Sequence, residues 1–348
     1  MPLLFAVLEA KGANPYAWNT VAIVGLDGYA RAKTTFTPMP IPAAGCMGAI
    51  LPPSAHVAAG KVFFADAKGV VRSLAINGTV TTVTTFPLTS TQQMLSFAVS
   101  PDGARVLGTV FTTPKNAFSC DGSTTTAAFS FDAYSAVSGQ ASQLVYHQSW
   151  TKPPSSVMAL TGWDAIGPIG TYPTVWASQG GGPGSTLGVF VRIDAATIKP
   201  LAPLADPSKC PAWDTAASGD FVCIEDPVVN SAGMYDQTVS IRRVDDSEVW
   251  KFTVTTDDGA VYSASLAPDE QHVVLGAGYV TEVAGRDGSR VKLGSQVLGQ
   301  QFWESGWLNS STLIGGDSKT FGYVRLSAPG TVVPLGFTGL FLGTVQGG

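Results

Sequence analysis

The chain has 348 residues, of which 13% are charged and 45% are apolar. About a quarter of the residues of an average protein are charged, so this composition favours β-strands and tight turns over amphipathic helices. The net charge of −5 and the lack of a Lys/Arg cluster argue against nucleic acid as a partner. No apolar run reaches the roughly 20 residues of a membrane span, so membrane insertion is not expected. We expect one domain over residues 1–348, because no linker or charge block divides the chain.

Seven turn signals recur along the chain, each between two short runs typical of β-strands. They are Asp27-Gly28, Asn77-Gly78, Ser138-Gly139, Asp194 to Thr197, Asp245 to Glu248, Asp287-Gly288 and Pro329-Gly330. Successive signals are 42 to 61 residues apart. This is the period of a four-stranded propeller blade with loops of variable length. The sequence therefore predicts an all-β fold, a seven-bladed β-propeller.

Strands are predicted in chain order around these turns. The strands directly before the turns cover residues 20–25, 70–76, 127–132, 187–193, 238–244, 279–285 and 321–326. More apolar strands precede them at residues 3–10, 60–67, 104–111, 171–178, 220–226, 271–278 and 311–316. Six of these seven blades also have an innermost strand upstream, whereas the first has none. The unassigned run at residues 339–345 is expected to supply it, so that the last strand pairs with the first and closes the ring.

Two inner turns carry a recognisable pattern. Residues 97–107 read Phe-Ala-Val-Ser-Pro-Asp-Gly-Ala-Arg-Val-Leu, and residues 266–274 are a looser copy, Leu-Ala-Pro-Asp-Glu-Gln-His-Val-Val. This pattern resembles the inner hairpins of TolB-type propellers and of the propeller domains in dipeptidyl-peptidase-like enzymes. Pro and Asp set the turn and the apolar flanks pack between blades, so the resemblance implies the fold and no activity.

The longest loops are expected on one face of the ring. In a propeller, the connections from second to third strand, and from one blade to the next, open on the same face, here called the long-loop face; the opposite one is the short-turn face. The loops of the long-loop face cover residues 11–19, 112–126, 179–186 and 227–237. Long loops on a rigid scaffold are where binding residues concentrate, so we expect the site there.

Three innermost strands are predicted to begin with an aromatic residue followed by an acid. These pairs are Trp163-Asp164, Trp213-Asp214 and Trp303-Glu304. At the mouth of the central channel they would stack on a sugar and accept its hydroxyl hydrogen bonds, or hold calcium, the one cofactor that we consider. Alternatively, each Trp fills the wedge between two blades and each acid caps a turn or accepts a neighbour's backbone N–H.

Aromatic residues in the long loops offer the same choice. Trp18 and Tyr235, with Tyr16 and Phe118, would extend the binding surface, since rigid exposed aromatics are common anchors for partners. Alternatively, they hold their own loops in place.

Little in the sequence points to catalysis. Its three histidines, His56, His147 and His272, fall in strands or near a short turn, so structural roles and no shared metal site are expected. Phosphate-binding and nucleophile-elbow motifs are missing. The only enzymatic alternative is a propeller hydrolase, a glycosidase or lactonase, that uses Asp164, Asp214 and Glu304.

Four cysteines, Cys46, Cys120, Cys210 and Cys223, occur without a C-x-x-C pair, so disulfides or buried thiols are expected in place of a zinc site. Cys46 and Cys120 suit a bridge that fixes a long loop, and a bond between Cys210 and Cys223 requires a shift or bulge between their strands. Even cysteine number and low charge favour an extracellular or periplasmic protein.

The favoured function is a non-enzymatic binding propeller that presents its long-loop face and channel mouth to a glycan or a protein. The sequence does not define its oligomeric state.

Overall fold

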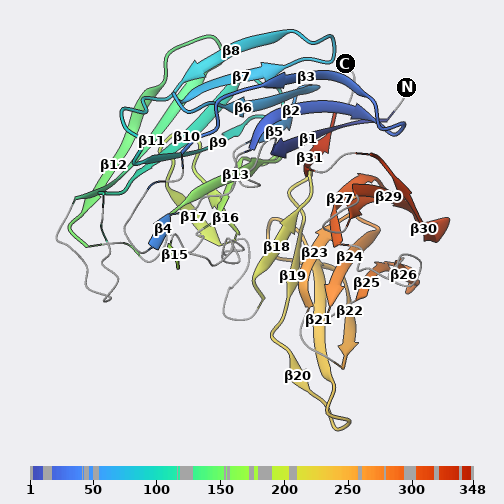
Figure 1. Ribbon diagram of the computed structural model, residues 1–348. Coiled ribbons are helices and arrows are strands. Elements are labelled where there is room, and N and C mark those ends of the chain that lie inside the picture. The colour runs from blue at the N-terminus through green and yellow to red at the C-terminus, as the bar shows by residue number, and fades with distance from the viewer. Residues whose placement is uncertain are drawn as a thin grey trace.

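The computed structural model describes most of the chain. The described residues are 3–10, 18–40, 42, 47–49, 55–115, 117, 128–152, 154, 157–171, 176–178, 190–203, 210–257, 261–277, 280–293, 303–316, 321–336 and 339–345. Among them, strands form seven sheets of four or five strands arranged as the blades of a ring, together with one two-stranded pair (Figure 1). The chain is thus a seven-bladed β-propeller, as its turn spacing predicts.

The first four blades follow the chain, and their strands are given from the innermost outward. Blade 1 contains β31 (Leu340–Thr344), β1 (Leu4–Ala10), β2 (Trp18–Gly25) and β3 (Ala30–Thr35). Blade 2 contains β5 (Ala55–Ala58), β6 (Lys61–Ala65), β7 (Val70–Leu74) and β8 (Val80–Thr85). Blade 3 contains β9 (Gln93–Val99), β10 (Arg105–Thr112), β11 (Phe129–Val137) and β12 (Gln143–Trp150). Blade 4 contains β13 (Ala159–Trp163), β14 (Pro168–Thr171), β16 (Phe190–Ile193) and β17 (Pro200–Pro203).

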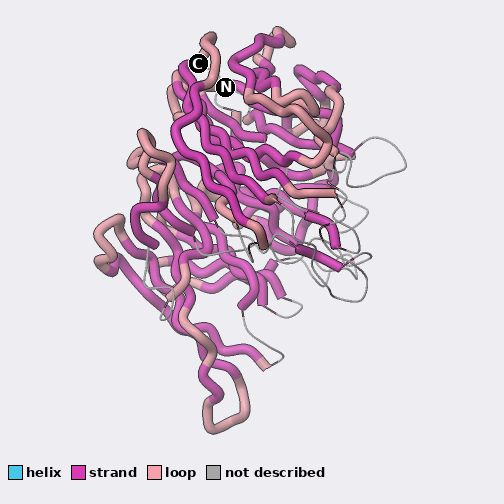
Figure 2. Tube along the Cα trace, turned by 90° about the vertical axis from the view of Figure 1, so that its left-hand side faces the viewer, coloured by secondary structure: helices cyan, strands magenta, loops and turns pink. Residues whose placement is uncertain are grey.

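Three further blades complete the ring. Blade 5 contains β18 (Ala212–Thr215), β19 (Phe221–Ile224), β21 (Tyr235–Arg242) and β22 (Glu248–Thr256), and the short β20 (Val228–Val229) also pairs with β21. Blade 6 contains β23 (Val261–Leu266), β24 (His272–Ala277), β25 (Val280–Gly285) and β26 (Arg290–Leu293). Blade 7 contains β27 (Trp303–Asn309), β28 (Thr312–Gly316), β29 (Phe321–Arg325) and β30 (Ala328–Pro334). Figure 2 shows the strands of successive blades and draws no helix.

The last strand closes the ring, as predicted. β31 pairs antiparallel with β1, and Phe5 lies opposite Thr344. The N–H of Val345 donates to the carbonyl oxygen of Leu4 at 2.9 Å. The two described ends of the chain therefore lie side by side (Figure 1). The inner edge of β1, which would otherwise be open, is covered.

Apolar clusters fill the space between neighbouring blades. Between blades 2 and 3, for example, Val71 and Phe86 pack against Phe97 and Val110. The Phe86 ring lies so close to Gly108 that a Cβ there would stand 2.6 Å from the ring. A side chain at this position would push the two blades apart, so the interface requires glycine. No helix of the described residues is long and apolar enough to cross a membrane.

Blade 4 differs from its prediction. The run at residues 171–178 was expected to be a single strand, but β14 ends at Thr171 and β15 (Trp176–Ser178) pairs with β4 (Met47–Ala49) in the separate two-stranded sheet. The inner hairpin of blade 4 thus lies several residues earlier in the chain than predicted. The apolar residues Val157 to Leu160 are buried there and decide the register, because the pattern of burial specifies which residues pair.

The last outer turn also differs. It was predicted at Pro329-Gly330, but Arg325 pairs with Ala328, so the turn is formed by Leu326 and Ser327. Pro329 instead lies in β30, the outermost strand of blade 7. An outermost strand tolerates proline because one of its edges makes no ladder hydrogen bonds.

Both inner turns with the Pro-Asp pattern lie at first-to-second strand turns. In blade 3, Gly103 has a φ of +72° and its N–H donates to the Ser100 carbonyl oxygen at 2.7 Å, and the Asp102 carboxylate accepts the N–H of Ala104 at 3.0 Å. In blade 6, Glu270 takes the glycine place with a φ of +58°, a conformation that costs free energy for a residue with a Cβ.

Candidate functional site

The three predicted Trp-acid pairs do not lie at one end of the channel. Trp163 ends β13, so Trp163 and Asp164 lie at the short-turn face, opposite to the prediction. Trp213 lies within β18 near its start, and Trp303 begins β27, as predicted. The side chains of Trp303 and Glu304 lie outside the described residues. The shift of the blade 4 hairpin explains the error at Trp163.

Asp164 takes part in a buried ion pair. Arg192 of β16 donates from Nη1 to Asp164 Oδ1 at 2.6 Å and from Nη2 to the carbonyl oxygen of Gly219 in blade 5 at 3.1 Å. The same Oδ1 accepts the N–H groups of Ile166 and Gly167. Asp164 thus caps its own turn while Arg192 links blades 4 and 5. This is the structural alternative considered for the acid.

Asp214 links the innermost strands of blades 5 and 6. Its Oδ2 accepts the N–H of Leu266 in β23 at 2.9 Å, and its Oδ1 accepts the N–H of Thr215 at 2.8 Å. Burial raises the pKa of Asp214, and these hydrogen bonds, with one from the Ser265 hydroxyl, oppose the rise. The carboxyl group of Asp214 is surrounded by protein, but the residue as a whole is half-buried. Its strand, β18, is an innermost strand and lies beside the central channel. Trp213 packs against the core between these blades.

The loop aromatics lie at strand ends. Trp18 begins β2, is half-buried and packs against the core between blades 1 and 2. Tyr235 begins β21 and is half-buried, and it pairs with both Val229 and Thr256. Residues 228–236 thus form a hairpin that projects from blade 5 (Figure 1). Binding by these residues stays a prediction, and Tyr16 and Phe118 lie outside the described residues.

The histidines have surroundings typical of structural residues. Burial lowers the pKa of His56 to about 4, and its ring packs edge-on against Phe97 with 4.9 Å between centroids. His147 Nδ1 lies 2.6 Å from Oδ1 of Asp132, which belongs to the neighbouring strand β11. Within the described part of the chain, no three His, Cys, Asp or Glu side chains are grouped so that they could hold a metal ion. Calcium binding stays a prediction.

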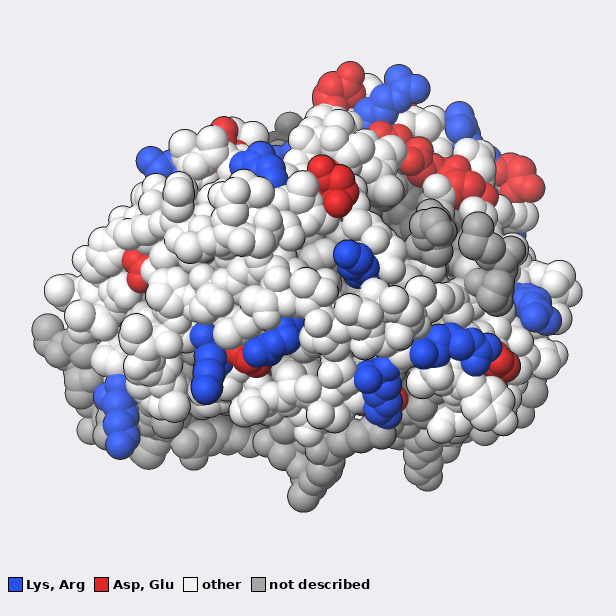
Figure 3. Space-filling model, turned by 90° about the horizontal axis from the view of Figure 1, so that it is seen from above, with Lys and Arg blue, Asp and Glu red and all other residues white. Residues whose placement is uncertain are grey.

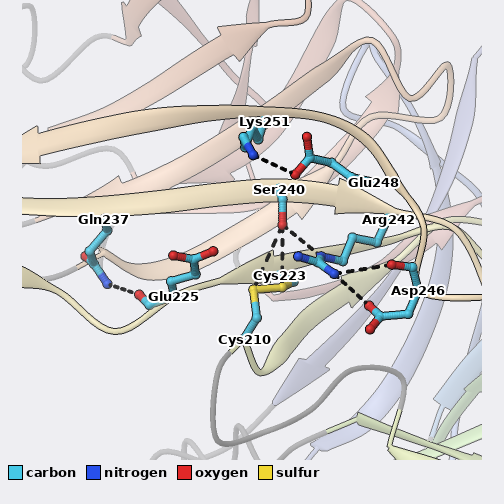
Figure 4. The surroundings of a disulfide bond; sticks show 9 residues. All are labelled: Cys210, Cys223, Glu225, Gln237, Ser240, Arg242, Asp246, Glu248 and Lys251. Carbon is cyan, nitrogen blue, oxygen red and sulfur yellow. Dashed lines mark hydrogen bonds and ion pairs between the residues drawn. A yellow bond between two sulfur atoms is a disulfide. The ribbon is translucent and has the colours of Figure 1, made fainter.

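One disulfide bond lies inside blade 5. Cys210 and Cys223 are bonded, with their Cα atoms 5.3 Å apart, and the Ser240 hydroxyl donates to Cys223 Sγ at 3.6 Å (Figure 4). The register shifts between Ala212 and Asp214, which is the irregularity that the sequence required for this bond. Cys46 and Cys120 lie outside the described residues.

A charged pair lies beside the disulfide. Arg242 donates from Nε to the Ser240 hydroxyl at 3.1 Å and from Nη1 to the Asp246 carboxylate at 3.0 Å (Figure 4). Hydrogen bonds therefore link the disulfide through Ser240 to the ion pair of Arg242 and Asp246.

One hollow lies on the side of the ring, between β12 of blade 3 and blade 4. We call it the rim groove; its volume is about 410 Å³. Phe131, Met158 and Ile198 are buried beneath it, while Tyr146 and Trp150 of β12 are half-buried and line it. The groove thus combines a sealed apolar floor with partly accessible aromatic rings.

Polar groups surround these rings. The Tyr146 hydroxyl donates to Gln148 Oε1 at 2.9 Å, which fixes its direction. Lys199 lies over the Tyr146 ring, with Nζ 5.3 Å from the centroid. Such a geometry is a cation–π contact. Tyr146, Gln148 and Trp150 stand two residues apart on one strand, so their side chains share a face.

Trp150 also lines a second hollow of about 450 Å³, here called the end hollow, with Ala128, Ser149, Thr151 and Lys152. β12 ends at Trp150, on the side of the long-loop face. Trp150 is the residue that lines both hollows.

This region was not predicted as a site from the sequence, which indicates residues 143–148 only as the strand after the third outer turn. The alternation of Tyr146, Gln148 and Trp150 was the available signal. The outer strand of a blade is half covered, so large aromatic residues on one of its faces indicate either a core contact or a binding surface.

Two carboxyl groups meet on the short-turn face between blades 5 and 6. Burial, followed by the charge of Glu270, raises the pKa of Asp220. The Ser218 hydroxyl donates to Glu270 Oε1 at 2.5 Å, and the Glu270 carbonyl oxygen accepts the indole N–H of Trp250 at 3.2 Å. Arg243 offsets part of the repulsion.

This pair predicts a pH-dependent stability. Because the folded pKa of Asp220 lies above its unfolded value, its contribution is fully present below the unfolded pKa and is lost as the pH rises through the folded pKa. Asp220→Asn should therefore stabilise the protein at pH 7 by about 0.5 kcal/mol, a size suited to a partly exposed group, and not at pH 3. Urea unfolding at both pH values measures this. The exposed Asp226→Asn in the same blade is the control, and an equal effect of Asp220→Asn at both pH values would contradict the prediction.

No protein-family model matches the sequence, and no curated protein matches it. Solved structures do resemble the fold. An oligogalacturonate lyase in complex with manganese is 9% identical, with a TM-score of 0.51 over 92% of this chain and 90% of the other. The Dos1 propeller is 11% identical, with a TM-score of 0.46 over 97% and 84%. A putative TolB from Agrobacterium tumefaciens is 13% identical, with a TM-score of 0.37 over 96% and 89%. Of these three, only the first has a TM-score above 0.5, and at 9% identity it shows the fold alone: this chain is built as a β-propeller.

Proposed function

We propose that this propeller is an exported, non-enzymatic binding protein whose ligand is a carbohydrate. The observation that carries the proposal is the rim groove, where Tyr146 and Trp150 line a hollow of about 410 Å³ over a buried apolar floor. This volume falls in the range of small-molecule sites. The end hollow, which Trp150 also lines, lies where β12 ends, near the long-loop face on which the sequence predicts the ligand.

The chemistry of the rings favours a sugar. Tyr and Trp offer large, rigid, amphipathic surfaces that lose little conformational entropy when a ligand covers them. The apolar face of a pyranose ring suits such a surface, while Gln148 and Tyr146 supply hydrogen-bonding groups at its edge. A protein ligand at the long-loop face is the second form of this proposal, and Trp18 and Tyr235 would serve it.

Export is proposed from the disulfide bond between Cys210 and Cys223. Disulfides persist in oxidising compartments and are rare in reducing ones. Thiol labelling of the protein in its own cells, with and without prior reduction, tests this part. Labelling of both cysteines before reduction would count against export.

Removing the indole of Trp150 tests the binding site. A glycan array identifies oligosaccharides that the protein binds, and calorimetry then compares the protein with Trp150→Ala. We expect at least a 10-fold loss of affinity, as for the central aromatic residue of an interface.

Trp250→Ala is the matched control, because Trp250 is also a half-buried residue of an outermost strand, in blade 5. It should bind as the unchanged protein does. Equal binding by Trp150→Ala and the unchanged protein, or an array without any bound oligosaccharide, would refute the proposal. Circular dichroism melting verifies that both variants are folded.

Hydrolysis is the second candidate, and the burial of Asp214 favours it. A carboxyl group with a raised pKa keeps its proton closer to neutral pH and can serve as a general acid. Incubating the protein with the oligosaccharides that it binds, and analysing them for shortened products, decides between binding alone and hydrolysis. Products that disappear in Asp214→Asn would support hydrolysis.

A further inference from the structure

We infer that the rim groove and the end hollow form one site that selects acidic oligosaccharides, with Lys199 and Lys152 binding the acidic groups. This inference rests on the proposed carbohydrate binding and adds the charge and the minimum length of the ligand.

The minimum length of the ligand is inferred from Trp150, which the two hollows share. Trp150 lines both hollows, so a ligand long enough to pass its ring can occupy both of them. The two hollows have volumes of about 450 and 410 Å³. Both are open at the surface and follow the end of one strand, which suits a chain of sugar units better than a single compact molecule.

The charge follows from the lining. Lys152 lines the end hollow and Lys199 lines the rim groove, and no Asp or Glu lines either one. Both lysines are exposed, and within the described residues neither lies within ion-pair distance of a carboxylate. Nearby, Asp132 is directed to His147 and lines neither hollow.

Some other lysines of the described residues have a carboxylate partner. Lys33 pairs with Glu9 at 3.0 Å, and Lys251 pairs with Glu248 at 3.0 Å. The face of the molecule in Figure 3 is mostly uncharged, with acidic residues gathered at the upper right and Lys and Arg residues scattered across it. Lys152 and Lys199 line the two hollows and make no ion pair with a described residue, so they give the site a local positive field in a protein with a net charge of −5.

Electrostatic complementarity mainly provides specificity, so the lysines should separate acidic from neutral sugars. Two charges are too few for a nucleic acid backbone, whose binding requires a larger basic face. An oligosaccharide with carboxylate groups on separate units fits both the rings and the lysines.

A matched pair of ligands tests the inference. The probes are a hexuronic acid tetramer and its carboxyl-reduced counterpart, which keeps the sugar backbone and loses the charges. We expect the acidic tetramer to bind about 10-fold more tightly than the neutral one. Lys152→Met and Lys199→Met should each reduce this preference about 3-fold, and the double variant should nearly abolish it. Added salt should lower the affinity for the acidic tetramer only.

Lys292→Met, an exposed lysine of β26 in blade 6, is the control and should keep the full preference. Equal affinity for both tetramers, with loss of both in Trp150→Ala, would overturn the inference while carbohydrate binding stands. Binding of neither tetramer, together with an empty glycan array, would overturn both. A preference that survives in the double variant would place the acidic group elsewhere and also refute the inference.

Discussion

Deleting residues 339–348 should lower the free energy of unfolding by about 4 kcal/mol, because the first blade loses its innermost strand. The deleted segment provides Val345, which is buried, and Phe341 and Leu342 of β31, which pack against the clusters on the two sides of blade 1. Each such side chain contributes roughly 1.5–3 kcal/mol when fully buried, and less when partly buried. Urea unfolding followed by tryptophan fluorescence measures the loss.

A peptide with the sequence of residues 339–348 provides the control. Added in trans, it should restore the melting temperature in proportion to the logarithm of its concentration, since it binds the folded state alone. A scrambled peptide should not. A truncated protein with an unchanged melting temperature would show that the pairing of β1 with β31 contributes nothing to stability.

Replacing Arg192 by methionine should cost about 3–5 kcal/mol, because it leaves the carboxylate of Asp164 buried without its counter-charge. The side chain of Arg192 is 10% exposed and that of Asp164 is 3% exposed, and 2.6 Å separates Arg192 Nη1 from Asp164 Oδ1. The change also removes the hydrogen bond to Gly219 and hence a link between blades 4 and 5. Urea unfolding of Arg192→Met gives this value directly.

The double variant separates charge from packing. Asp164→Asn keeps an oxygen for the N–H groups of Ile166 and Gly167 and removes the negative charge. Asp164→Asn combined with Arg192→Met should therefore be more stable than Arg192→Met alone. A single variant that loses less than about 1 kcal/mol would mean that the pair is not held in a water-excluding site.

Much of the fold could be predicted because turns and apolar runs recur with one period. Six of the seven outer turns lie where Gly, Asn or Asp signals placed them, and the unmatched run at residues 339–345 revealed the closing strand. The prediction was wrong where the same residues are compatible with two kinds of structure. Pro329-Gly330 looks like a turn, yet the outermost strand accepts it. The run at residues 171–178 looks like one strand, yet it separates into β14 and β15.

The candidate site was harder to predict because it depends on which blade faces which. Trp163, Trp213 and Trp303 share a sequence pattern, but a shift of a few residues in blade 4 moved Trp163 to the opposite face. The rim groove joins β12 to residues of the next blade near Met158 and Lys199. Sequence periodicity reports the face of a strand and not the partner across the gap, so such a groove emerges only from the packing of two blades.

The closure of blade 1 also orders events during biosynthesis. Phe5 pairs with Thr344, so the first blade cannot be completed until the chain has been translated as far as Thr344. At about 5–20 residues per second this delay is roughly 20–70 s. Throughout that time the inner edge of β1 is available to other chains, and contacts so distant in sequence form slowly. The nascent protein thus has a defined interval of vulnerability that ends when its final strand arrives.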